Sequence, residues 1–416
     1  MKAPLSRGAR FAVLAAAFGG LLFDGFELGL MPLASLSVSK SLLGANYTAT
    51  LGGDWFARFT AALMLGAAIG GIFLGALGDR IGRARAMGVS ILFYSLFAGL
   101  GAWVQTQEQM LVLRFLVGLG VGGVWPNAVA LVAESWPDKA RPTVAGLMGA
   151  AINTGVLILS QVAQIWSVTV AEWRWLFHLA AAPAGLGVAV IFFLPESRSW
   201  LASRAAPGAK KPTAPLRLLF RPPLLRITLV GIMLGSIPLI GAWAASKWMI
   251  PWADKIGGAT QTDYKALTQG WWAFGAILGS LAGAQVASLL GRRCSYFLIS
   301  VGSLVLTIAM FQLTAPLRPS FLPIVFAQGL VATLFFGWLP LYLPELFPTH
   351  VRATGSGISY NVGRFATAGG VLVAGAVFGA LGGSYPAVGT VAALIYGFGI
   401  FAIWWAPNTA PQDLQK

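Results

Sequence analysis

Two acidic residues, Asp24 and Glu27, interrupt an apolar run near the start of the chain, in the segment 21-LLFDGFELGLMP-32. Their spacing of three places both carboxyl groups on one broad face of a helix. An ionisable side chain inside a membrane is costly unless it is paired or faces water, so such residues usually mark a functional cavity. The same reasoning applies to Arg114 and Arg364, which lie inside later apolar runs.

The chemistry open to these four residues is proton exchange together with anion binding. A carboxyl group takes up and releases protons, and both burial and a neighbouring guanidinium change its proton affinity. We therefore expect Asp24, Glu27 and Arg114 to form a proton-coupling site, in which a movement of Arg114 switches Asp24 between proton binding and release. The alternative is a permanent ion pair that only fixes helix packing.

Arg364 is the expected substrate clamp. It lies about ten residues into the apolar run 354–381, near the midplane of a membrane by the helical rise of about 1.5 Å per residue, and no acid lies inside an apolar run of the same half. A guanidinium binds a carboxylate in two places at once. We expect Asn361 and Tyr360 to assist by hydrogen bonding; in the alternative, backbone carbonyl groups of a broken helix satisfy Arg364.

Other polar and aromatic residues in apolar runs are candidates for the rest of the substrate site. Asn153 and Gln161 lie in the run 143–168, and Gln328 and Trp338 lie in the run 321–343. Polar side chains in membranes also link helices to each other, so both roles stay open for them. Tryptophans near the ends of two later runs are expected to be interfacial anchors, with an aromatic gate as the alternative. They are Trp243, Trp248, Trp252, Trp271 and Trp272.

The composition indicates a polytopic membrane protein, because 57% of the 416 residues are apolar and 10% are charged, against roughly a quarter charged in soluble domains. Runs of about 20 apolar residues predict membrane-spanning helices. The predicted spans are 10–35, 55–77, 86–104, 109–133, 143–168, 175–194, 224–246, 266–289, 294–313, 321–343, 354–381 and 385–406. The single cysteine excludes a disulfide framework, and neither a metal site nor a cofactor is expected.

The basic residues orient the chain. Most of the 28 Lys and Arg residues fall in loops on the side of the N-terminus, which predicts that both termini are cytoplasmic. This bias and the lipid headgroups also account for the net charge of +15, so no nucleic-acid partner is expected. We predict an N-terminal six-helix bundle over residues 1–197, a cytoplasmic linker over 198–223 and a C-terminal six-helix bundle over 224–416.

An internal repeat supports two related bundles. The segment 75-GALGDRIGRAR-85 follows the second predicted span, and 283-GAQVASLLGRR-293 follows the eighth. Likewise, 134-ESWPDKARPTVAG-146 follows the fourth span, and 345-ELFPTHVRATG-355 follows the tenth. The fold expected from this pattern is all-α, with twelve transmembrane helices in two bundles related by pseudo-two-fold symmetry.

These loops resemble the signature loops of the major facilitator superfamily. The segments 344-PELFPTHVRATG-355 and 360-YNVGR-364 resemble its metabolite:proton and sialate:proton symporters, and 113-LRFLVGLGVGG-123 resembles a basic fourth-span motif. The D-G-F-E sequence starting at Asp24 resembles the D-G-[FY]-D of aromatic-acid symporters, with Glu27 replacing the second Asp. The resemblance implies that Asp24 in the first span faces Arg114 in the fourth.

The resemblance also implies a conformational latch at the cytoplasmic ends of the helices, where acids and arginines attract each other across loops. In the second copy Ser288 takes the place of the acid Asp79, so a weaker latch is expected there. The predicted latch residues are Asp79, Arg80, Arg83, Glu134, Arg141, Glu345 and Arg352.

Counting charges gives the expected mechanism. With both acids ionised, Asp24, Glu27, Arg114 and Arg364 sum to zero, and one proton plus one monocarboxylate restores that balance. A neutral occupied cavity crosses the membrane with the smallest desolvation cost. We expect a monomeric proton symporter of a small organic anion in a bacterial inner membrane, and no enzyme. The alternative is a drug, organic-cation or sugar transporter of the same fold.

Overall fold

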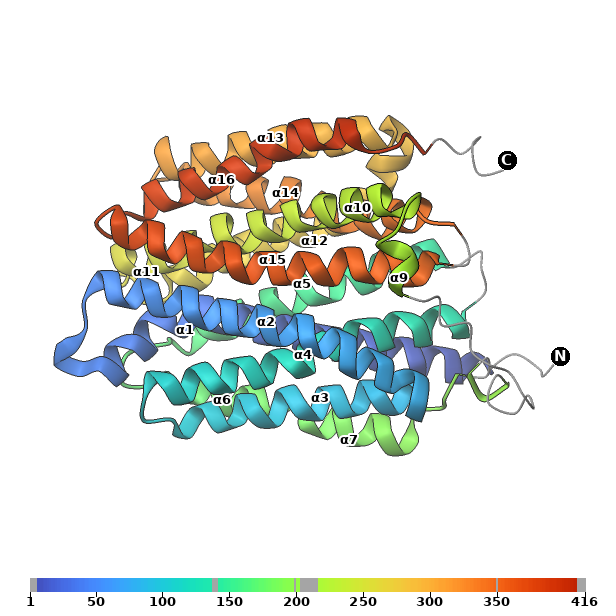
Figure 1. Ribbon diagram of the computed structural model, residues 1–416. Helices are drawn as coiled ribbons and strands as arrows, with labels where there is room; N and C mark the ends of the chain where they lie inside the picture. Colours follow the sequence, from blue (N-terminus) through green and yellow to red (C-terminus); the bar gives the residue numbers. More distant parts are fainter. Residues whose placement is uncertain (1–5, 137–140, 198–199, 203–215, 349–350, 410–416) are drawn as a thin grey trace. The chain divides into compact units, whose positions relative to one another are not determined.

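The computed structural model describes residues 6–136, 141–197, 200–202, 216–348 and 351–409, and its regular structure in these ranges is helical. The described chain contains 12 helical segments that are long and apolar enough to cross a membrane. The predicted number of spans is therefore confirmed. Within each half of the chain, the long helices run alongside one another (Figure 1).

The first half contains six of these spans. The sixth span is divided into two helices at Pro183, because proline cannot donate the backbone hydrogen bond that would continue the helix. The helices are α1 (Arg7–Leu43), α2 (Ala49–Ile81), α3 (Arg83–Leu100), α4 (Gln107–Ser135), α5 (Arg141–Ile165), α6 (Arg174–Ala181) and α7 (Ala184–Phe193).

The second half contains the other six spans and one short helix before them. The helices are α9 (Leu216–Leu219), α10 (Leu224–Ile240), α11 (Met249–Gly257), α12 (Tyr264–Leu290), α13 (Arg292–Gln312), α14 (Phe321–Glu345), α15 (Arg352–Ala380) and α16 (Tyr385–Ala402).

The seventh span is longer than predicted and is irregular. It runs over Leu224–Gly257, where α10 and α11 are joined by a π-helical turn, Gly241–Ala245, and a 3₁₀ turn, Ser246–Trp248. Pro238 lies inside α10 and leaves the carbonyl group four residues earlier without its helical donor. The Tyr296 hydroxyl donates to that carbonyl group, on Leu234, at 3.0 Å.

The chain divides into two compact units. Unit 1 comprises Met1–Thr48 and Arg58–Lys211, and unit 2 comprises Ala49–Ala57 and Pro212–Lys416. The division after Lys211 falls inside the predicted linker 198–223. The start of α2 groups with unit 2, which the sequence did not predict.

Close packing of glycines repeats from one unit to the other. In unit 1, Gly66 and Gly70 of α2 face carbonyl groups of α4. A methyl group added at Gly66 would lie 2.1 Å from the nearest carbonyl oxygen, and one added at Gly70 would lie 2.0 Å from its nearest carbonyl oxygen. In unit 2, Gly275 and Gly279 of α12 face α14 in the same way, at 2.2 and 2.1 Å. Small residues let membrane helices approach closely. The second and fourth spans therefore pack like the eighth and tenth.

The turns in the two signature loops share one conformation. Gly82 has a φ of 109° and precedes Arg83, and Gly291 has a φ of 82° and precedes Arg292. Positive φ values favour glycine, because other residues meet a steric clash there. The sequence repeat thus specifies the same tight turn before α3 and before α13.

Candidate functional site

A buried ion pair joins α1 to α4. Nη2 of Arg114 donates to Oε2 of Glu27 at 2.8 Å, and Asp24, Glu27 and Arg114 are each 1% exposed. The structure thus corrects the predicted pairing: Arg114 binds Glu27 and makes no ion pair with Asp24 in the described ranges. Glu27 is where the segment departs from the D-G-[FY]-D pattern, and its longer side chain makes the ion pair.

The ion pair keeps unused hydrogen-bonding capacity. Oε1 of Glu27 and Nη1 of Arg114 are buried and have no hydrogen-bond partner among the described residues. An unsatisfied buried polar atom costs more than a single hydrogen bond contributes, so such atoms call for an explanation. Both atoms therefore have capacity for a further hydrogen-bond partner.

Close helix packing holds α1 in place around Asp24. Gly25 packs closely against the carbonyl group of Ile152 in α5. A methyl group added at Gly25 would lie 1.9 Å from the carbonyl oxygen. The Tyr94 hydroxyl of α3 donates to the carbonyl group of Gly20 at 3.2 Å, one turn before Asp24. Two neighbouring helices therefore fix the height and rotation of the acidic segment.

The residues predicted to bind the substrate carboxylate lie together on α15. Arg364, Tyr360 and Asn361 are each partly exposed. The guanidinium carbon of Arg364 lies 5.2 Å from the centroid of the Tyr360 ring, within cation–π range. The Asn361 amide donates to the carbonyl group of Gly357 at 3.0 Å. Tyr360 thus lies beside Arg364, whereas the amide nitrogen of Asn361 is used within its own helix.

Gln328 links helices in unit 2. Its side chain is fully buried. Its Oε1 accepts from the indole of Trp272 at 2.7 Å, and its Nε2 donates to the hydroxyls of Ser246 and Thr307 at 2.5 and 3.2 Å. All of these bonds connect different helical segments. The geometry therefore favours the helix-linking alternative for Gln328.

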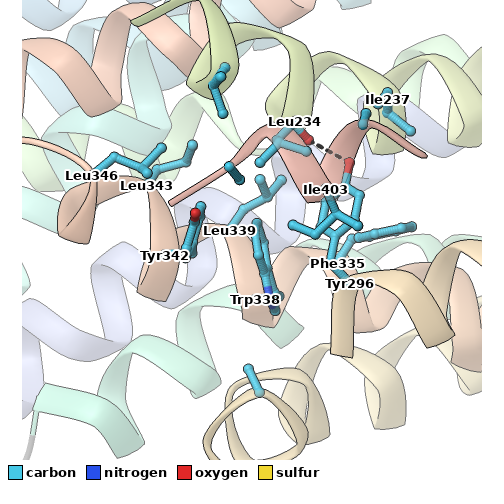
Figure 2. Close-up of a cluster of buried hydrophobic side chains, with 14 of the residues drawn as sticks. Leu234, Ile237, Tyr296, Phe335, Trp338, Leu339, Tyr342, Leu343, Leu346 and Ile403 are labelled. Carbon is cyan, nitrogen blue, oxygen red and sulfur yellow. Dashed lines mark hydrogen bonds between the residues drawn. The ribbon is translucent and has the colours of Figure 1, made fainter. Parts of the chain in front are cut away.

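Trp338, the other predicted substrate contact in this span, belongs to the hydrophobic core of unit 2 (Figure 2). Its indole donates to the carbonyl group of Arg292 at 2.8 Å. Its ring lies 4.5 Å from Tyr342 and 4.7 Å from Tyr296, measured between centroids. The structure therefore places Trp338 in packed core, because aromatic neighbours already cover its ring.

The polar residues of α5 differ in their environments. Asn153 is buried, whereas Gln161, about two turns later, is exposed. The two candidate substrate contacts of this span therefore lie in different surroundings.

Lys247 is a buried cation that the sequence reasoning did not include in the site, because it lay at the edge of the predicted seventh span. Its side chain is 3% exposed. Its Nζ lies 3.5 Å from the centroid of the Trp272 ring and 5.8 Å from that of Trp243. The charge count of the predicted mechanism omitted this residue. A lysine among closely spaced tryptophans was the signal available in the sequence.

The expectation that the five tryptophans are interfacial anchors is wrong for most of them. Trp271 is 40% exposed, but the other four are buried. Trp243 and Trp248 lie in the irregular turns after α10, and Trp252 lies in α11, whereas the predicted span ended at residue 246, inside those turns. The buried residues are Trp243, Trp248, Trp252 and Trp272.

A loop cluster in unit 1 contains several predicted latch residues. Arg83 forms an ion pair with Asp79 and lies 3.7 Å from a carboxylate oxygen of Glu134. Sequence reasoning missed Glu196, whose carboxylate accepts hydrogen bonds from the first backbone amides of α3. The amide of Arg83 donates at 2.8 Å. It also missed Ser197, whose hydroxyl donates to Glu134. The sequence signal that could have identified both residues was their position in 195-PESRSWL-201, directly after the sixth span.

Two further predicted latch residues belong to unit 1. Arg80 is exposed near the end of α2. Arg141 begins α5, and its side chain lies outside the described part of the structure.

The corresponding cluster in unit 2 is built on Glu345. Arg292 donates to both carboxylate oxygens of Glu345 at 2.8 and 3.1 Å, and the Thr409 hydroxyl donates at 2.7 Å. Ser288 bonds within its own helix, as its hydroxyl donates to a carbonyl group of α12. Arg352 donates to the carbonyl group of Phe347 at 3.3 Å. The ion pair of this loop is thus the two-point contact of Arg292 with Glu345, and Ser288 contributes no charge to it.

No group of three or more His, Cys, Asp and Glu residues in the described ranges could hold a metal ion.

The chain is similar to known transporters over most of its length. A family model described as Major Facilitator Superfamily matches residues 12–371. A cis,cis-muconate transport protein of Acinetobacter baylyi is 31% identical, over 91% of this chain and 92% of the relative. A probable 4-methylmuconolactone transporter of Cupriavidus pinatubonensis is 30% identical, over 95% and 90%. The inward-open structure of the xylose transporter XylE from Escherichia coli shares the fold, with a TM-score of 0.73 at 17% identity over 97% of this chain and 98% of that one.

Proposed function

The chain belongs to the major facilitator superfamily, and from this membership we propose that it imports a small organic anion together with one proton. The protein is a multi-pass membrane transporter and not an enzyme. The proposed mechanism is alternating access, in which a site near the middle of the membrane opens to one side at a time. The proposed orientation has both termini in the cytoplasm, because most basic loop residues lie on that side.

The observation that carries the proposal is the buried charge in unit 1. Asp24, Glu27 and Arg114 are almost fully buried, and Arg114 donates to Glu27 at 2.8 Å. Two ionised carboxylates buried in one helix turn are costly, and uptake of one proton lowers that cost. Because an ion pair requires an ionised carboxylate, we assign the proton to Asp24.

Arg364 supplies the anion-binding part of the proposal. A partly exposed guanidinium on a spanning helix can bind a carboxylate through two parallel hydrogen bonds. The Tyr360 ring lies beside the guanidinium, within cation–π range. The relative named for cis,cis-muconate supports an organic acid as substrate. A monocarboxylate, an aromatic acid and a sugar acid all fit this chemistry.

The test is uptake by purified protein in proteoliposomes with an acidic exterior. Labelled benzoate, lactate, cis,cis-muconate and sialic acid are compared with labelled xylose and a cationic dye. One pH unit is worth about 1.4 kcal/mol per proton, so symport of one proton with one monocarboxylate supports about tenfold accumulation. Uptake of xylose or the dye, without uptake of any acid, would overturn the proposal.

The variant Asp24→Asn separates coupling from binding. It should lose accumulation driven by the pH gradient and keep exchange of labelled for unlabelled acid, because exchange needs no net proton movement. The matched control is Glu108→Gln, at the exposed start of α4, which should accumulate normally. Full accumulation by Asp24→Asn would remove Asp24 from the proton pathway.

A further inference from the structure

Lys247 lies at the irregular part of the seventh span. It belongs to the 3₁₀ turn Ser246–Trp248, directly after the π-helical turn. Such turns inside membrane helices occur frequently at functional sites, because they change the direction of side chains and free backbone groups. The turn here carries a lysine side chain into the interior of unit 2, where it is 97% buried.

The charge of Lys247 is only partly compensated within the described residues. Its contacts there are the ring faces of Trp272 and Trp243, and it has no acidic partner and no hydrogen-bond acceptor in those ranges. The acid later in the same span, Asp254, is bound to Lys265 at 3.1 Å. A cation–π contact offsets only part of the cost of removing an ammonium group from water. The remaining cost favours an anion at Lys247.

The aromatic face beside Lys247 is held rigidly. The indole N–H of Trp272 is bound by Gln328, and Gln328 is bound in turn by Ser246 and Thr307. This network fixes the plane of the Trp272 ring from three other helical segments. A binding group held by its neighbours loses little entropy when a ligand arrives. The arrangement is therefore preorganised, with an ammonium group against an indole that its neighbours hold in place.

This site is distinct from Arg364, although both lie in unit 2. Gly363, the residue before Arg364, packs against α10. A methyl group added at Gly363 would lie 3.3 Å from the Cα of Ser236. Trp248, which follows Lys247, stacks on Phe378 near the other end of α15 at 4.9 Å. Eleven residues separate Ser236 from Lys247, or roughly 16 Å along the helix axis. The two cations therefore start from well-separated positions along the span.

We propose that Lys247, with Trp272 and Trp243, forms a second anion site that receives the carboxylate of an acid with a planar π system. The ammonium group binds the carboxylate, and the fixed indole stacks on the conjugated part of the ligand. The proposal rests on organic-anion transport and narrows its substrate class to aromatic and conjugated acids. It gives unit 2 two separate cationic positions along the length of α15.

The first experiment measures initial uptake of labelled benzoate by the full chain in proteoliposomes. Lys247→Met keeps the length of the side chain and removes its charge, and we expect it to raise the KM for benzoate about tenfold or more. Lys247→Arg keeps the charge and should restore most of the affinity. If Lys247 has a packing role only, Lys247→Met will lower the amount of folded protein and leave the KM per folded molecule unchanged, which would overturn the proposal.

The second experiment tests the aromatic face. Cyclohexanecarboxylate has the charge and nearly the size of benzoate but no π face, so it should compete severalfold less well against labelled benzoate. Trp272→Leu should remove this preference, and Trp271→Leu, at the exposed neighbouring residue, should keep it. If the wild-type protein and Trp272→Leu prefer benzoate over cyclohexanecarboxylate to the same extent, a stacking role of Trp272 is contradicted.

The outcomes separate this inference from the proposed function. If the wild-type protein takes up lactate but no aromatic or conjugated acid, organic-anion transport stands and the second site falls. The same holds if benzoate is taken up and Lys247→Met keeps the wild-type KM. If the wild-type protein takes up none of the acids and carries xylose or the dye, the proposed function itself fails. If Lys247→Met does not fold, the KM for benzoate of Lys247→Arg and the competition measured with Trp272→Leu still test the second anion site.

Discussion

Each unit buries a cation inside a membrane-spanning segment, but the two cations are compensated in different ways. In unit 1, the guanidinium of Arg114 lies 2.8 Å from the carboxylate of Glu27. In unit 2, the ammonium group of Lys247 lies against the faces of two indoles. An ion pair balances its own charge, whereas an aromatic face leaves most of the positive charge in place. The proposed roles follow this difference, with proton coupling proposed for unit 1 and anion binding proposed for unit 2.

The largest expected effect is on stability, from removing each cation in turn. Arg114→Met leaves the carboxylate of Glu27 buried without its partner, which should cost about 3–5 kcal/mol. Lys247→Met leaves no charge behind and fills the same volume, so its effect should stay within about 1 kcal/mol. Thermal unfolding of the purified variants in one detergent measures both. Equal losses in the two variants would show that the cations are compensated alike.

The double variant Arg114→Met with Glu27→Gln is the control for that comparison. Because it removes both charges together, it should recover most of the stability that Arg114→Met loses. It should still fail in proton-driven accumulation. A double variant that is no more stable than Arg114→Met would indicate that Arg114 acts through packing.

A smaller effect is expected from the loop clusters of the two units. Arg292 binds Glu345 at two points and both side chains are mostly buried, so Arg292→Ala should cost about 1.5–3 kcal/mol. In unit 1, Asp79 is 48% exposed, and Asp79→Asn should cost less than about 1 kcal/mol. Unfolding in low and high salt measures both, because salt weakens the exposed pair more. A greater loss in unit 1 would reverse this ranking.

The fold could be predicted from the sequence because its signals are local. Runs of about 20 apolar residues give the spans, and the repeated loops before Arg83 and Arg292 give the two related halves. A span is recognised by its composition alone. Its internal irregularities are less visible, and Pro238 was the one local sign of the disturbed turn in the seventh span.

The candidate site was predictable as a set of residues but not as a set of contacts. Asp24, Glu27 and Arg114 are all buried, yet which acid meets Arg114 depends on the rotation and height of α1 against α4. Spacing along one helix carries no information on these quantities. Lys247 and the neighbouring tryptophans were misplaced for the same reason, since burial follows from the turn that redirects them.

The smallest expected effect concerns the start of the third membrane span in each half of the chain. Glu196 accepts hydrogen bonds from the first backbone amides of α3, whereas α13 begins at Arg292 and its N-cap residue, Gly291, provides no side-chain cap. A carboxylate at a helix N-terminus stabilises the unpaired amides and the helix dipole by about 0.3–1 kcal/mol. Glu196→Gln should therefore lower stability by about that amount. Glu172→Gln, at an exposed residue of the same unit, should change nothing measurable. A loss of several kcal/mol in Glu196→Gln would mean that this carboxylate also holds the Arg83 cluster together, and unit 1 would then depend on its loop charges as strongly as unit 2 depends on Glu345.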